Sequence, residues 1–134
     1  MELEERCNAI EEGYEFMLAF AAQGLASDQG SQSGSQIRDF LNRQVEAMSG
    51  LAEAYAAAVR QGGFEPADRY QAFLAVLDRD ARDSIAAIQL VLAQPVISSQ
   101  LIDNLNASIH LRALLTGLFL IDEILKLRSA PLTS

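Results

Sequence analysis

The sequence contains a single cysteine, Cys7, and a single histidine, His110. One cysteine cannot form an internal disulfide, and one thiolate cannot supply a cysteine-rich metal cluster. Basic residues are also scarce, with 10 lysines and arginines against 18 aspartates and glutamates and a net charge of −8. A surface of this sign repels phosphate backbones and anionic headgroups, so neither a nucleic-acid partner nor a membrane partner is expected.

Long apolar segments are missing as well. The uncharged stretch from Ser84 to Ile102 carries several glutamines and serines together with Pro95, which a membrane-spanning helix does not tolerate. The first residues are acidic, and no basic segment leads into an apolar one, so no secretory signal is expected. We therefore expect a protein of a reducing, bacterial-type cytoplasm.

The composition favours helix. The chain has 134 residues, half of them apolar, which is enough for one domain with a continuous core. Alanine and leucine, both strong helix formers, are abundant. The mean hydropathy is slightly above zero, which is high for a monomer of this size and suggests a buried subunit face.

The periodicity predicts four helices, over residues 2–24, 35–61, 66–93 and 98–128. Apolar residues in each segment recur three and four positions apart, Ser35 is suited to cap the second helix, and Pro66 suits a first turn. The last two connections are too short for a crossover, so neighbouring helices should be antiparallel. We expect an all-α, up-down-up-down four-helix bundle that forms a single domain over residues 1–134.

The most apolar segment runs from Ile109 to Leu127. Its apolar side chains leave only a narrow polar strip along the helix. A helix that is apolar over most of its circumference must be covered by several neighbours. We expect it to be the central helix. In the first helix, Phe16 and Phe20, with Gly13 beside them, extend the apolar arc to one side. They are a candidate interface for a homodimer; the alternative is that they widen the core of a monomer.

Catalytic and metal-binding motifs are incomplete. A di-iron site requires two Glu-x-x-His pairs, but the residue three positions before the only histidine is Ala107. Cys7 lies on the core seam of the first helix, where a thiol is usually a small apolar side chain. The glycine- and serine-rich segment 27–35 lacks the strand and lysine of a phosphate loop. We expect no enzyme activity, no metal and no cofactor.

Several polar side chains lie on otherwise apolar stripes: Tyr14, Gln44, Tyr55, Ser84 and His110. One interpretation is a buried hydrogen-bond network that fixes the helix register. The other is a small pocket between the helices, in which Gln44, Ser84 and His110 contact a ligand.

Three segments, EEGYEFMLAFAAQG at 11–24, IRDFLNRQVEAM at 37–48 and LIDNLNASIHLRALLTGLFLIDEILKL at 101–127, resemble the small bacterioferritin-like proteins encoded beside carboxysome genes. The resemblance concerns helix order and length over most of the chain. It implies a ferritin-like fold and an association with a carbon-fixing compartment. Because the Glu-x-x-His pairs are absent, it implies no iron storage and transfers no functional residue.

Three functions therefore compete. The first is a non-enzymatic, self-associating adaptor or assembly protein. The second is a ligand-binding or vestigial ferritin-like protein with a pocket around His110. The third is a helical export chaperone, which would leave an apolar groove open in the free protein.

Overall fold

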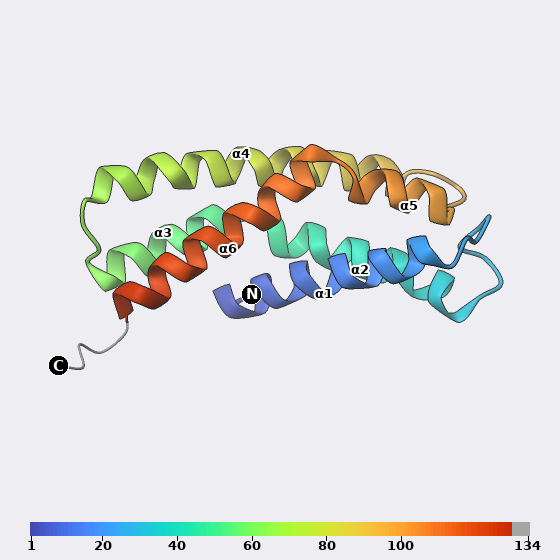
Figure 1. The fold of residues 1–134 in the computed structure, drawn as a ribbon, viewed down its shortest axis with the longest axis horizontal. Helices are drawn as coiled ribbons and strands as arrows, with labels where there is room; N and C mark the ends of the chain where they lie inside the picture. The colour runs from blue at the N-terminus through green and yellow to red at the C-terminus, as the bar shows by residue number, and fades with distance from the viewer. Residues whose placement is uncertain (130–134) are drawn as a thin grey trace.

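The computed structural model describes residues 1–129, and they are helical and contain no strand (Figure 1). The expected all-α class is thereby confirmed. The helices are α1 (Leu3–Ala22), α2 (Gln32–Met48), α3 (Leu51–Gly62), α4 (Ala67–Leu92), α5 (Ser99–Asn106) and α6 (Ile109–Ser129). The expected ferritin-like four-helix bundle remains a prediction, because two of the four predicted helices are each divided in two.

The predicted helix over 35–61 is interrupted at Gly50, which adopts a left-handed conformation with φ of +80°. The guanidinium of Arg6 lies at this point and donates hydrogen bonds to the carbonyls of Glu46 and Ala47, at 3.3 and 3.1 Å. Carbonyls in the last turn of a helix lack partners within the helix, so the arginine stabilises its end. The second interruption, near Ala107, separates α5 from α6. At the start of α2, the cap is Ser31 and not Ser35.

The helices α1 and α4 organise the packing. The helix α1 lies against α2 and α5, whereas α4 lies against α2, α3 and α6. The helix α6 packs along α4. Its C-terminal end therefore lies near the connection between α3 and α4 and away from most of α1 (Figure 1). The largest fully buried side chains include Ile10, Met17, Phe20, Ile37, Leu41, Tyr55, Leu77 and Ile88.

The loop between α1 and α2 is tied to the connection between α4 and α5. The carboxylate of Asp28 accepts hydrogen bonds from the Ile97 amide and from Arg38 Nε, both at 2.9 Å. The same arginine donates to the carbonyls of Leu92 and Gln94. Burial opposes ionisation of Asp28, but these hydrogen bonds outweigh it and the pKa of Asp28 lies below its ordinary value. The carboxylate therefore joins the loop between α1 and α2 to the connection between α4 and α5.

The candidate interface on the first helix is wrong, because most of it lies inside the monomer. Phe20 is fully buried, and Gly13 is buried at the place where the side chain of Gln44 crosses α1. Phe16 is half-buried and stacks on Phe40, with 4.2 Å between ring centroids. The alternative, a wider monomer core, is correct for this arc, because α2 covers the side of α1 that was expected to be free.

The helix α6 is not central. Its inner face, which includes Leu114 and Leu118, is buried, but none of the described residues covers its outer face. Ile109, Leu120 and Leu127 are all more than half exposed. The prediction of a fully covered helix is therefore wrong for the monomer, because α6 packs mainly on α4 and diverges from α1.

The close approach at Gly13 yields a prediction. A Cβ atom there would lie 2.5 Å from the side-chain carbons of Gln44. Although alanine is favoured over glycine in a helix by about 0.5–1 kcal/mol, overpacking costs about 1–3 kcal/mol. Gly13→Ala should therefore lower the free energy of unfolding, as measured by urea denaturation. In a Gln44→Ala background the same substitution should be neutral or stabilising, and an equal loss in both backgrounds contradicts the steric explanation.

Candidate functional site

The predicted polar residues do not converge on one pocket. Gln44 is fully buried and donates from Nε2 to the carbonyl of Ile10 at 3.0 Å. Ser84 is also buried, and its hydroxyl has no hydrogen-bond partner among the described residues. Both side chains therefore lie in the interior, as a register-fixing network requires, but no hydrogen bond joins them within residues 1–129.

His110 and Tyr14 lie elsewhere. His110 is half exposed, and its Nδ1 atom is 3.6 Å from the Asp83 carboxylate on the surface of α4. Tyr14 is half-buried. The predicted pocket lined by Gln44, Ser84 and His110 is therefore wrong, because the helix α6 turns the imidazole towards solvent beside α4 instead of into the core.

Tyr55 forms the most developed polar contact in the interior. Its hydroxyl donates to Asp122 Oδ1 at 2.5 Å, and Cys7 Sγ lies 3.1 Å from the same oxygen. A phenol has one proton to donate. Because the phenol uses this proton in its hydrogen bond to the carboxylate, the thiol of Cys7 must be the donor in its hydrogen bond with Tyr55. The result is a directed chain of hydrogen bonds from α1 through α3 to α6.

The electrostatics of this chain favour a structural role. Burial raises the pKa of the Cys7 thiol, and the nearby Asp122 raises it further. Burial likewise raises the pKa of Tyr55, and the hydrogen bond to Asp122 adds to that effect. A nucleophilic cysteine requires a lowered pKa and a positive surrounding. The three residues therefore hold helices together and do not activate a nucleophile.

A groove of about 510 Å³ lies directly outside this chain, between the start of α1 and the end of α6. The groove has carboxylates on both helices and a single cation. It is lined by Leu3, Glu4, Cys7, Asn8, Glu11, Asp122, Leu125 and Lys126. Burial raises the pKa of Asp122 and, together with the charge of Asp122, that of Glu11. Negative charge is thus concentrated beside partly buried leucines.

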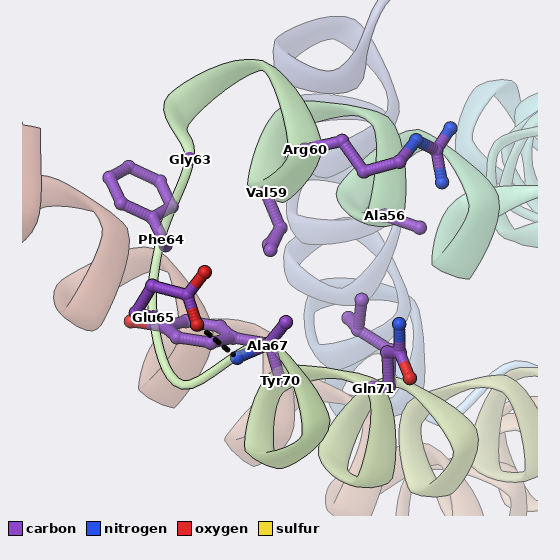
Figure 2. A pocket seen from close by; sticks show the side chains of 10 residues that line it. Ala56, Val59, Arg60, Gly63, Phe64, Glu65, Ala67, Tyr70 and Gln71 are labelled. Atoms are coloured by element: carbon purple, nitrogen blue, oxygen red, sulfur yellow. Dashed lines mark hydrogen bonds between the residues drawn. The ribbon is translucent and has the colours of Figure 1, made fainter.

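A second hollow, of about 230 Å³, lies at the turn from α3 to α4 (Figure 2). Val59 points into it from α3, Tyr70 and Ala67 border it from α4, and Arg60 extends away (Figure 2). The carboxylate of Glu65 accepts a hydrogen bond from the Ala67 amide at 3.1 Å, so it serves the first turn of α4.

Sequence reasoning did not identify Asp122 as part of a site. The signal was present, because Asp122 interrupts the most apolar segment of the chain, GLFLIDEIL. Burying a carboxylate beside such a segment costs free energy unless a hydrogen-bond donor reaches it. That donor, Tyr55, is 67 residues away in the sequence, so the pairing depended on the tertiary structure.

The substitution Tyr55→Phe tests the structural role. It should lower the free energy of unfolding by about 1–3 kcal/mol, because it removes a donor from a half-buried carboxylate and an acceptor from the thiol. The matched control is Tyr14→Phe, which should change stability by less than about 0.5 kcal/mol. Urea denaturation of both variants measures the difference, and equal effects would show that the hydroxyl of Tyr55 contributes nothing specific.

The raised pKa of Asp122 gives a prediction with a defined sign. The folded state binds this proton more tightly than the unfolded state, in which the pKa is near 3.8. The contribution of Asp122 to the free energy of unfolding is therefore fully present below that pH. It is lost as the pH rises through the raised folded-state pKa. Asp122→Asn, which keeps an acceptor for Tyr55, should gain stability relative to the wild type over that interval.

The control for this experiment is Asp28→Asn. The pKa of Asp28 is lowered, so its stabilisation is present at neutral pH and is lost as the pH falls through its folded-state pKa. Thermal unfolding of both variants and the wild type across the acidic range measures the two differences. They should change with pH in opposite directions, and a difference for Asp122→Asn that does not vary with pH contradicts the interpretation.

Comparison with family models, with curated proteins and with solved structures yields no match for this chain. Within residues 1–129, no group of three or more histidine, cysteine, aspartate or glutamate side chains is arranged to hold a metal ion. No helix in the described part of the chain has the length and apolar character needed to cross a membrane.

Proposed function

We propose that this protein is a non-enzymatic helical adaptor that binds a basic amphipathic helix of a protein partner in the groove between α1 and α6. The observation that carries the proposal is the lining of the groove. Leu3 and Leu125 supply apolar surface, and Glu4, Glu11 and Asp122 surround it with negative charge. An amphipathic helix presents a matching apolar stripe, with cations on its flanks.

The position of the groove supports this occupant. The helices α1 and α6 border it along parts of their lengths, and their divergence leaves a trough that is open to solvent. A trough between two helices is the usual seat of a third helix, because its ridges fit between theirs. The wider surface agrees, since α1 carries five glutamates and only one arginine.

The site offers little to a catalytic function. The raised pKa values favour the neutral forms of the Cys7 thiol, which lines the groove, and of the Tyr55 phenol behind it, and His110 lies on a different surface, beside Asp83. The export-chaperone function would use the same kind of trough for a secreted partner. The association with a carbon-fixing compartment, which rests on the sequence resemblance, remains a prediction about which partner supplies the helix.

A peptide-binding measurement tests the proposal. The probe is a fluorescently labelled amphipathic helix of lysine and leucine, and the readout is fluorescence anisotropy. The double variant Glu4→Gln/Glu11→Gln removes two charges from the groove and should weaken binding by about five- to tenfold, at roughly 0.5–0.7 kcal/mol for each charge.

The matched control is Asp39→Asn/Glu53→Gln. It removes the same net charge from exposed positions outside the groove, and Glu53, like Glu4, lies in the first turn of its helix. The control should bind the peptide within about twofold of the wild type, since distant surface charges are screened at physiological salt. Equal weakening in both double variants would mean that the peptide recognises total charge, and the proposal would be wrong.

A further inference from the structure

The outer face of α6 carries a second apolar surface that no part of the described chain covers. Four of the nine exposed large apolar side chains of residues 1–129 lie on this helix: Ile109, Phe119, Leu120 and Leu127, at 74, 57, 52 and 67% exposure. With 3.6 residues per turn, Ile109, Leu120 and Leu127 form one line along the helix. That line is opposite the buried face, so the core does not account for it.

This surface continues onto α4. Leu120 and Ile124 border an apolar hollow of about 320 Å³ together with Tyr70 and Phe73 of α4. Phe73 also lies against Gly117, where an added Cβ would be 3.6 Å from its ring. The exposed apolar region therefore spans two helices, and their close packing holds its side chains in a fixed arrangement.

We propose that this surface binds a second copy of the chain, with the two α6 helices antiparallel about a two-fold axis at the level of residues 117 and 118. The exposed large side chains lie towards both ends of the line, with Ile109 in the first turn and Leu120 and Leu127 in the second half. Antiparallel pairing places Ile109 of each copy near Leu127 of the other, so that each covers an apolar side chain of its partner.

Charge complementarity also favours the antiparallel arrangement. Arg112 and Glu123 lie on the same flank of the outer face, and neither forms an ion pair within residues 1–129. In an antiparallel pair, residues on the same flank face each other. Arg112 of one copy therefore lies opposite Glu123 of the other, and the two-fold axis generates the contact twice. Phe119, on the same flank and next to the axis, meets Phe119 of the second copy.

Two acidic chains repel each other, and contact through α6 limits this repulsion. With three basic and two acidic side chains, α6 is the one helix with a net positive charge among the six described. Two copies that meet through α6 keep their glutamate-rich α1 helices apart. Contact through α6 thus keeps the most acidic helices of two molecules of charge −8 away from each other.

Sedimentation equilibrium of the whole protein, with the oligomeric state as the readout, tests the inference. The wild type should be dimeric, and Leu120→Asp should be monomeric with an unchanged helical circular dichroism spectrum. The matched control is Leu18→Asp on α1, where the leucine has nearly the same exposure, 48% against 52%. This control should remain dimeric. A monomeric wild type, or a dimeric Leu120→Asp variant, overturns the proposal.

A charge exchange tests the antiparallel arrangement and does not depend on the folding of Leu120→Asp. Arg112→Glu alone should weaken the dimer by about tenfold or more, because it places like charges in contact twice. Adding Glu123→Arg should restore the wild-type dissociation constant. If the double variant is as weak as the single one, the two residues do not face each other and the proposed arrangement is wrong. The groove between α1 and α6 takes no part in either measurement.

Discussion

The hydrogen bonds from Cys7 through Tyr55 to Asp122 join three helices at the end of the molecule where α1 and α6 diverge. The helices α1 and α6 have few direct contacts, so Tyr55 of α3 links them. The carboxylate accepts its hydrogen bond from the phenol, and the phenol accepts one from the thiol, so the two hydrogen bonds strengthen each other. Two of these residues, Cys7 and Asp122, line the groove, and Asp122 contributes a carboxylate to it. The geometry of the proposed partner site thus depends on a buried structural interaction.

The opposite end of the molecule is held by a second buried carboxylate, with a different electrostatic outcome. Asp28 accepts hydrogen bonds from the Ile97 amide and from Arg38, so its charge is compensated and its pKa is lowered. Asp122 receives one donor and no cation in direct contact, so burial prevails and its pKa is raised. The two ends therefore respond to acid in opposite ways. Asp28 links two connections at its end of the molecule, whereas Asp122 lines the groove, where a partner can contact it.

The helix α6 has three different surfaces. Its inner face is buried on α4, one edge borders the acidic groove, and its outer face carries Ile109, Leu120 and Leu127. These surfaces are separated around the helix, so a partner helix and a second copy would use different parts of it. A two-fold dimer through α6 would carry two grooves, one on each copy. Such an arrangement suits an adaptor, because two linked sites bind a multivalent partner more tightly than one.

The sequence by itself determined the all-α class, the approximate helical segments and the excess of apolar surface, because periodicity and composition are local properties. It did not determine which apolar arcs were covered. Phe20 and the face of α6 through Leu120 look alike in sequence, yet α2 and α5 lie against α1, whereas no described helix covers the outer face of α6. The division of two helices, the pairing of Tyr55 with Asp122 and the exposure of His110 were decided by the tertiary structure. Each depends on contacts between residues far apart in the chain, which local pattern cannot specify.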